Sequence, residues 1–179
     1  MVQLVLYQPD IAQNFGAILR LSACLGCMVH VIEPCGFPLD AAKLKRAGMD
    51  YIHKAQYLRH VNWQAFLDYR MQMDEARRVA QASPKGGGLG AMPPSRLLLL
   101  ETDGEHRYTD VRFAPEDYVM LGSESAGTPR ALYGQMDATI TIPMRTGMRS
   151  LNVAMSAGIV VAEAARQRDW KFDCIDLVS

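Results

Sequence analysis

The chain has 179 residues, a hydrophobic share of 49%, and 19 basic against 19 acidic side chains. That length fits one ordinary domain over residues 1–179, since no long Gly/Ser-rich linker divides it, and the balanced charge excludes a uniformly basic surface, so any RNA site must be a local patch. No apolar run reaches the roughly 18 residues of a membrane span and no basic, apolar leader precedes the first strand, so we expect a cytoplasmic protein without a membrane partner.

The first part of the chain alternates between strand-like and helical patterns. Residues 2–7 are apolar and β-branched and predict a strand, and apolar residues recur at helical spacing through residues 11–25. Residues 28–32 predict a second buried strand. A helix over about 39–47 and a short third strand at 51–53 are expected to follow.

The middle of the chain interrupts this alternation. Residues 63–69 predict a helix, which the charged stretch 74–81 either continues or follows as a separate short helix. Residues 83–94 are rich in Gly and Pro, and they join two structured regions too closely to be a domain linker. We therefore predict that residues 71–96 form an inserted surface excursion.

The last part of the chain returns to the alternating pattern. Strands are predicted at 96–102, 118–121 and 138–142, and a loop rich in Gly and Ser follows each of the last two. Residues 151–168 form the longest predicted helix, whose many small side chains would allow close packing against a sheet or a second copy of the chain. The pattern predicts the α/β class, with a mostly parallel sheet flanked by helices.

The four cysteines do not form a recognisable framework. Cys24 and Cys27 have the spacing of a redox pair or of half a zinc site, but no second pair and no nearby set of histidine ligands accompanies them. Cys35 and Cys174 are isolated. We interpret the cysteines as small buried side chains and predict no metal site.

Three segments that each follow a predicted strand carry polar side chains, and α/β folds place ligands at such loops. Residues 14–20 begin with an asparagine that can cap a helix and end with an arginine about two turns further on, roughly on the same side. Residues 121–129 contain Glu124. Within residues 140–152, Ser150 can cap the last helix, whose first N–H groups can hold a polar ligand.

Two common enzyme classes are excluded by the same loops. The sequence around Ser125 is similar to the nucleophile elbow of esterases, but Ser123 stands where that elbow needs glycine. The last histidine, His106, precedes Ser125, whereas the esterase triad needs a later one. The first strand is also not followed by the Gly-x-Gly-x-x-Gly pattern that binds dinucleotides.

Together the three segments resemble the motifs of the SPOUT superfamily, specifically its tRNA 2'-O-methyltransferases. They read Asn-x-Gly-x-x-x-Arg from Asn14, Gly-x-Glu-x-x-Gly-x-Pro from Gly122, and Ile-Pro-Met followed by Ser-Leu-Asn up to Asn152. Further stretches resemble the short members that methylate the ribose of the wobble cytidine or uridine: residues 6–9, 32–37 and 44–51.

The resemblance implies a fold, a cofactor and partners. It implies a C-terminal deep trefoil knot, S-adenosylmethionine (SAM) as methyl donor with S-adenosylhomocysteine (SAH) as product, no metal, a homodimer, and the anticodon stem-loop of tRNA as substrate. It assigns catalysis to Arg20 with a surrounding polar group of Asn14, Glu124, Ser150 and Asn152. It further implies that SAM contacts the following residues, largely through the backbone: Leu100, Gly122, Ile142, Ser150 and Leu151.

The resemblance also carries a proposal that Arg20 is the base that accepts the 2'-hydroxyl proton. A guanidinium with a pKa above about 12 is a poor base at neutral pH. We therefore expect Arg20 to pair with a phosphate and to stabilise the developing alkoxide. Glu124 is expected to orient Arg20 or the backbone of its own loop, while Asn14, Ser150 and Asn152 hold the ribose, the loops or the amino-acid part of SAM.

Basic side chains beside the motifs are candidates for RNA contact. Lys43, Lys45 and Arg46 fall on one short predicted helix, and Arg145 and Arg149 flank the third motif. Clusters of this kind bind phosphates without reading sequence, and the alternative is an ordinary solvated face.

The chain departs from the resembling family at three places, one of which is the unusual insertion over residues 71–96. Residues 153–155 read Val-Ala-Met where the most similar members carry Leu-Ser-Asn, and Asp103 stands where many carry a basic residue. The altered residues after Asn152 keep open the alternative of methylation at another tRNA position or of rRNA. A second alternative, from a different functional class, is a non-catalytic module that binds SAM and RNA. The intact polar motif residues favour catalysis.

Overall fold

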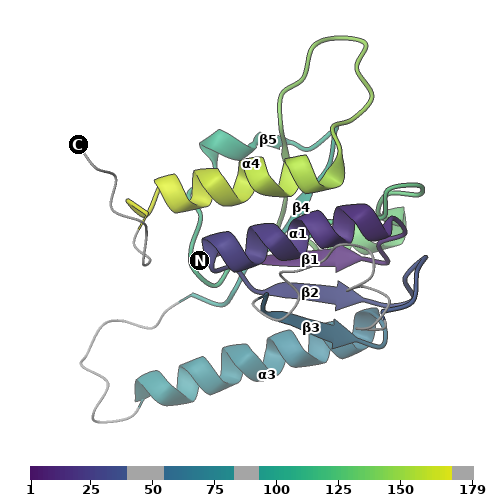
Figure 1. Cartoon of the computed structure of the whole chain (residues 1–179). Coiled ribbons are helices and arrows are strands. Elements are labelled where there is room, and N and C mark those ends of the chain that lie inside the picture. Colours follow the sequence, from purple (N-terminus) through teal and green to yellow (C-terminus); the bar gives the residue numbers. More distant parts are fainter. Residues whose placement is uncertain (40–54, 83–92, 171–179) are drawn as a thin grey trace.

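A computed structural model of the chain describes residues 1–39, 55–82 and 93–170. Within these residues, seven parallel strands form one sheet in the order β3-β2-β1-β6-β4-β7-β5 (Figure 1). The strands are β1 (Gln3–Tyr7), β2 (Val29–Ile32), β3 (Tyr57–His60), β4 (Leu97–Leu100), β5 (His106–Arg107), β6 (Tyr118–Leu121) and β7 (Ala138–Thr141). The predicted α/β class with a mostly parallel sheet is confirmed.

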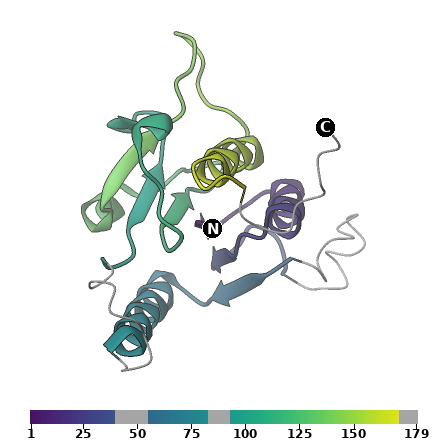
Figure 2. The same cartoon turned by 90° about the vertical axis from the view of Figure 1, so that its left-hand side faces the viewer.

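Helices cover both faces of this sheet. The helices α1 (Ala12–Leu25) and α4 (Val153–Arg166) lie side by side on one face, and α3 (Trp63–Ala82) lies on the other (Figures 1 and 2). Two short 3-10 helices, η1 (Tyr108–Asp110) and η2 (Arg130–Gln135), precede β6 and β7. None of the helices among the described residues is both long and apolar enough to cross a membrane.

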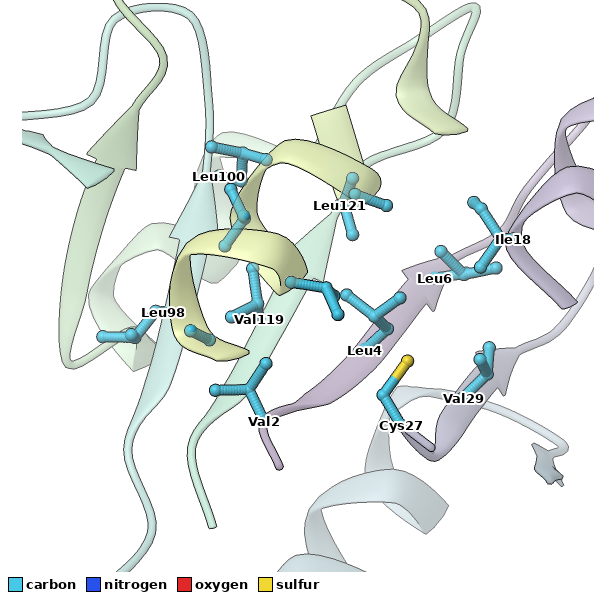
Figure 3. Packing of buried hydrophobic residues seen from close by; sticks show 14 of the residues in the cluster. Val2, Leu4, Leu6, Ile18, Cys27, Val29, Leu98, Leu100, Val119 and Leu121 are labelled. Carbon is cyan, nitrogen blue, oxygen red and sulfur yellow. The ribbon is translucent and has the colours of Figure 1, made fainter. Parts of the chain in front are cut away.

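The core between the sheet and the α1/α4 layer is built from alternate strand residues. Leu4 and Leu6 of β1 and Val119 and Leu121 of β6 point to this side (Figure 3), because successive side chains of a strand face opposite ways. Val5, between the two leucines, belongs to the core on the α3 side. Each fully buried aliphatic side chain contributes about 1.5–3 kcal/mol to folding.

The small residues of α4 are used largely within the chain itself. Ala157 and Ala165 are fully buried. Gly158 faces Leu21 of α1, because a Cβ atom at Gly158 would lie 4.0 Å from the Cδ1 atom of that leucine. The two helices can therefore approach closely, so much of the small-residue pattern is explained by packing of α4 on α1 and on the sheet.

A buried histidine pair lies on the α3 side of the sheet. His30 Nδ1 and His60 Nε2 are 2.9 Å apart, and His30 Nε2 lies 2.8 Å from Gln3 Oε1. The rings of Phe66 and Tyr118 pack edge-on against His30. Burial, aided by the charge of His60, lowers the pKa of His30 to about 3, and burial also lowers the pKa of His60. Both rings are therefore neutral at physiological pH.

The charged stretch 74–81 continues α3 and does not form a separate helix. The Asp74 carboxylate accepts hydrogen bonds from the Ser95 backbone N–H, at 3.2 Å, and from the Ser95 hydroxyl, at 2.9 Å. Of the predicted excursion over 71–96, residues 71–82 are thus the second half of a 20-residue helix that is anchored to the segment before β4.

Some local predictions concern residues outside the described part of the chain, and one prediction about a cysteine is wrong. The helix predicted over about 39–47, apart from Leu39, and the strand predicted at 51–53 lie outside the described residues, as does Cys174. Cys27 is buried and Cys35 is half-buried, but Cys24 is exposed, so the interpretation of that cysteine as buried was wrong. It lies on the outer side of α1, one residue before that helix ends.

Candidate active site

Four loops meet at the carboxyl edge of the sheet and line an open cavity of about 500 Å³. The cavity is lined from the segments that follow β1, β4, β6 and β7, together with the first turn of α4. Parallel strands place their carboxyl ends along one edge, and open α/β sheets bind ligands there. The three sequence segments with polar residues all reach this cavity.

Asn14 joins two of these loops. It lies in the first turn of α1, where its Nδ2 donates to Glu124 Oε1 at 2.9 Å and its Oδ1 accepts from Asn152 Nδ2 at 2.8 Å. The prediction that Asn14 caps the helix was wrong, because the N-cap position is Ile11, which makes no side-chain cap bond. The Asn14 side-chain amide instead forms hydrogen bonds to two loops that are distant in sequence.

Glu124 binds a second group in the loop after β1. Its Oε2 accepts from the Asp10 backbone N–H at 2.9 Å, so both carboxylate oxygens have donors. Asp10 in turn binds the loop that carries Glu124, since its Oδ2 accepts from the Ser125 backbone N–H at 3.2 Å and also from the Ser125 hydroxyl. These reciprocal bonds fix the loop after β6 against the loop after β1.

Asn152 is the N-cap of α4. Its Oδ1 accepts from the backbone N–H groups of Ala154, at 2.9 Å, and Met155, at 3.3 Å. The prediction that Ser150 fills this position was wrong, because a cap must directly precede the first helical residue, Val153, to reach those N–H groups. The cap uses only backbone atoms of residues 154 and 155, so their apolar side chains leave it intact.

The loop after β6 is tightly folded around two glycines. A Cβ atom at Gly122 would lie 2.5 Å from the Gly127 carbonyl carbon, and Gly127 itself has a φ of +66°. The Gly127 N–H donates to the Ser123 carbonyl at 2.8 Å. The resulting loop presents its backbone to the cavity. The residues expected to contact SAM all line this cavity: Leu100, Gly122, Ile142, Ser150 and Leu151.

Arg20 lies away from the cavity of its own chain. It is exposed on α1 and is not among the residues that line the cavity. The expectation that it shares a side with Asn14 was wrong, because six residues rotate a helix by about 600°, which leaves the two positions about 120° apart. The structure brings Asn14, Glu124 and Asn152 together, and it does not bring Arg20 to them within one chain.

Only two of the five basic residues predicted to contact RNA lie in the described part of the chain. Arg149 lines the cavity, and Arg145 is exposed on the same loop before α4. Lys43, Lys45 and Arg46 lie outside the described residues.

Sequence reasoning missed Asp10, Ser125 and Glu101. Asp10 received no functional role from its sequence context, and Ser125 was considered only as a failed nucleophile. Glu101 lines the cavity directly after β4, but it was absorbed into a strand predicted to run to residue 102. A charged residue immediately after four consecutive leucines was the signal that could have identified it as the end of the strand.

The donor types of the site are suited to an organic ligand. Among the described residues, no group of three or more His, Cys, Asp or Glu side chains is placed to hold a metal ion. The cavity instead offers leucine and isoleucine side chains, backbone of the glycine loop, and the carboxylates of Glu101 and Glu124.

Comparison with known proteins gives consistent matches. Residues 1–87 and 91–162 match the SpoU rRNA Methylase family. The tRNA (cytidine(34)-2'-O)-methyltransferase of Beijerinckia indica is 43% identical over 164 residues, which cover 92% of this chain and 90% of that relative.

Solved structures agree with these matches. One similar protein was solved in work on the 2-OH methylation of C/U34 on tRNA, and its sequence is 36% identical to this chain. The two structures superpose with a TM-score of 0.76, and the match covers 96% of this chain and 98% of the other. The SpoU methyltransferase AviRb of Streptomyces viridochromogenes, solved in complex with the cofactor AdoMet, is 26% identical with a TM-score of 0.75. That match covers 94% of this chain and 58% of AviRb.

Proposed function

The chain belongs to the SpoU methylase family, and from this premise we propose that it transfers the methyl group of SAM to the ribose 2'-hydroxyl of nucleotide 34 in tRNA. The observation that carries the proposal is the hydrogen-bonded chain Glu124–Asn14–Asn152, which ties all three motif loops to one cavity. Relatives that match over nine tenths of both chains are named as enzymes of this reaction.

The cavity fits SAM in size and in chemistry. Its volume of about 500 Å³ falls in the ordinary range of small-molecule sites. Leu100, Leu121 and Ile142 offer apolar surface for a purine ring, and Gly122 and Gly127, which carry no side chains, line the same space. We propose that these residues hold SAM, together with Ser150 and Leu151.

The proposal includes the C-terminal deep trefoil knot of the SPOUT fold. The strand order supports it, because β4 lies between β6 and β7, and the chain after β7 recrosses the sheet to place α4 against α1. The loops 122–129 and 142–152 would then form the knotted wall of the SAM pocket.

The protein's task in this reaction is to position and to polarise. SAM supplies a methyl group that its sulfonium already activates, so no metal is needed. Holding two reactants at near-attack geometry can supply about 7–11 kcal/mol of the barrier reduction. The bonds among Asn14, Glu124 and Asn152 keep the loops in place for this purpose. Arg20 is assigned to the phosphate and to the alkoxide that develops as the hydroxyl proton leaves.

We propose that a homodimer completes the site, with Arg20 of one subunit serving the cavity of the other. Arg20 is exposed on α1 and does not line the cavity of its own chain. Ile11, Leu151 and Met155, at the starts of α1 and α4, are apolar and are 41%, 37% and 60% exposed. A two-fold dimer, the commonest closed assembly, would cover such a surface.

A mixed dimer tests the shared site. One chain carries Arg20→Ala, and the other carries Ile142→Trp to fill its SAM cavity. If the site is shared, one of the two sites remains intact and about half of the activity of a wild-type dimer returns. If each chain is self-sufficient, the mixture stays inactive. Sedimentation that shows a fully active monomer would also rule out the shared site.

RNA binding is assigned to local basic groups. We propose that Arg145 and Arg149, which belong to the loop before α4, contact phosphates of the anticodon stem-loop, with Lys43, Lys45 and Arg46 as further contacts. The cytoplasm, where tRNA is modified and read, stays the predicted location.

Mapping the methylated nucleotide tests the proposed function. The protein is incubated with methyl-labelled SAM and total tRNA, and the tRNA is then digested and analysed by mass spectrometry. We expect the label in a 2'-O-methylated cytidine or uridine at position 34. A label on a base, at another tRNA position, or in rRNA offered as competitor would overturn the assignment. No transfer, with SAM still bound, would favour a non-catalytic module.

A further inference from the structure

The cavity contains one carboxylate that the loop network does not use. Glu101 directly follows β4, and its backbone N–H donates to the Ile140 carbonyl at 2.9 Å, so its main chain is fixed between β4 and β7. Its half-buried side chain lines the cavity. Oε1 lies 4.0 Å from the point where Gly127 would carry a Cβ atom, beside the glycine loop.

Two neighbours of Glu101, Tyr133 and Arg130, are affected by its charge. Burial raises the pKa of the Tyr133 hydroxyl, and the charge of Glu101 and a hydrogen bond to it raise that pKa further. Arg130 lies over the Tyr133 ring, 4.6 Å from its centroid, but its guanidinium is paired with Asp103 at 3.0 Å. None of the ion pairs among the described residues includes Glu101.

The other carboxylate of the cavity, Glu124, differs from Glu101 because it is already used in hydrogen bonds between loops. Both oxygens of Glu124 already accept hydrogen bonds, from the Asp10 backbone and from the Asn14 amide. Glu101 is therefore the carboxylate with capacity left for a ligand. A partly buried carboxylate that forms none of the ion pairs among the described residues favours a ligand that brings its own positive charge, since opposite charges attract more strongly near a protein surface than in bulk water.

We propose that Glu101 is a specificity-determining residue that makes the cavity prefer SAM over SAH by charge. The inference rests on the proposed function, because it takes SAM as the occupant of the cavity. SAM and SAH share an ammonium and a carboxylate group, and they differ by the methyl group and by the positive charge of the sulfonium. The carboxylate of Glu101 attracts that charge, and the neutral thioether of SAH gives it nothing comparable.

The preference has a consequence for turnover. During transfer the ribose 2'-oxygen forms a bond to the methyl carbon, the carbon–sulfur bond breaks with its electron pair left on sulfur, and the hydroxyl proton passes to solvent. The cavity then holds a neutral thioether, so its attraction to Glu101 weakens. The same residue therefore helps to bind the donor and to release the by-product.

Calorimetric titration of the full-length protein with SAM and with SAH tests the proposal. We expect wild-type protein to bind SAM more tightly than SAH. Glu101→Gln keeps the shape of the side chain and removes its charge, so it should weaken SAM binding roughly tenfold and SAH binding by less than about twofold. Glu101→Asp keeps the charge and should retain most of the preference.

A matched control is available four residues away. Glu105 is exposed and does not line the cavity, so Glu105→Gln should leave the ratio of the two dissociation constants unchanged. An unchanged ratio in Glu101→Gln, or equal losses for SAM and SAH, would overturn the charge selection while the proposed function stands. Wild-type protein that binds neither compound would overturn both. A shift in the ratio for Glu101→Gln alone, in a variant that unfolds at the wild-type temperature, would support the inference.

Discussion

Two networks of side-chain hydrogen bonds in this protein have similar distances but different surroundings. The cavity network joins Asn14, Glu124 and Asn152 at the carboxyl ends of the strands, and the histidine network joins His30 and His60 with Gln3 beneath α3. Heavy-atom distances in both are 2.8–2.9 Å. The first borders a cavity, whereas the second is packed among aromatic rings.

The placement decides what each network can do. In the neutral pair, His30 Nε2–H donates to Gln3 Oε1 and His60 Nε2–H donates to His30 Nδ1. If both rings were protonated, two N–H groups would face each other and this bond would be lost. No solvent or ligand reaches His30, which is fully buried. The histidine network therefore serves the fold, while the cavity network holds loops around a space that a ligand can enter.

The largest loss of methyl transfer is expected for substitution of Arg20, which is proposed to act in the cavity of the partner subunit. Arg20→Ala should lower methyl transfer at least about a hundredfold, because a charge stabiliser of the developing oxyanion is lost. The affinity for SAM should stay within a few fold and the free energy of unfolding nearly unchanged, since Arg20 is exposed. Arg20→Lys should fail as well, because a point charge does not replace a planar guanidinium. Near-normal turnover in either variant would show that the role is misassigned.

Asn14→Ala should disturb the cavity network itself. It leaves Glu124 Oε1 and the Asn152 amide without their partner, which should lower methyl transfer about tenfold or more and the free energy of unfolding by about 1–3 kcal/mol. Steady-state kinetics and denaturant unfolding measure the two losses. Loss of stability with unchanged kinetics would reduce Asn14 to a structural role.

His60→Phe makes the matched change in the histidine network. It keeps an aromatic ring but removes the donor to His30 Nδ1, so the free energy of unfolding should fall by about 1–3 kcal/mol. SAM affinity and methyl transfer should change by less than about twofold at a temperature where the variant is folded. A large kinetic defect in the folded variant would contradict the division between the two networks.

Acid should act on the histidine network first. Burial lowers the folded-state pKa of His30 to about 3 from its ordinary value of 6.5, so its stabilisation is fully present above pH 6.5 and is lost as the pH falls toward 3. The slope should reach about 1.4 kcal/mol per pH unit for this one histidine. Denaturant unfolding of the wild type between pH 7 and pH 4.5 measures it. The double variant His30→Phe/His60→Phe should lose this slope, and an equal slope there would contradict the assignment.

Metal removal should have the smallest effect. The carboxylate of Glu124 is used for hydrogen bonds and Asn14 and Asn152 are amides, so dialysis against EDTA should leave methyl transfer unchanged. Activity lost on chelation and restored by a divalent ion would show that the chemistry of the cavity is misread.

The two networks also differ in how well the sequence predicted them. The residues of the cavity network lie in recognisable motifs after predicted strands, so their convergence was expected. Their bonds were not, since Asn14 and Ser150 were read as local caps, while the structure uses Asn14 between loops and caps α4 with Asn152. Local pattern cannot reveal a bond whose partner lies 110 or 138 residues away.

The histidine network gave no signal at all. His30 lies within an otherwise apolar strand, and His60 ends β3, which was not predicted. The two missed strands, β3 and β5, are the edges of the sheet, and their residues are more exposed than those of the central strands. The central strands β1, β6 and β4 were predicted because burial on both faces requires continuous apolar runs.

The central claim is that the cavity directs a methyl group to the ribose oxygen of nucleotide 34. It is tested most directly by comparing tRNA substrates that differ only in carrying a 2'-deoxynucleotide at position 34 or at position 35. The account predicts that the substrate lacking the hydroxyl at 34 accepts no methyl group, while the substrate lacking it at 35 is methylated. Equal methylation of both substrates would contradict the account.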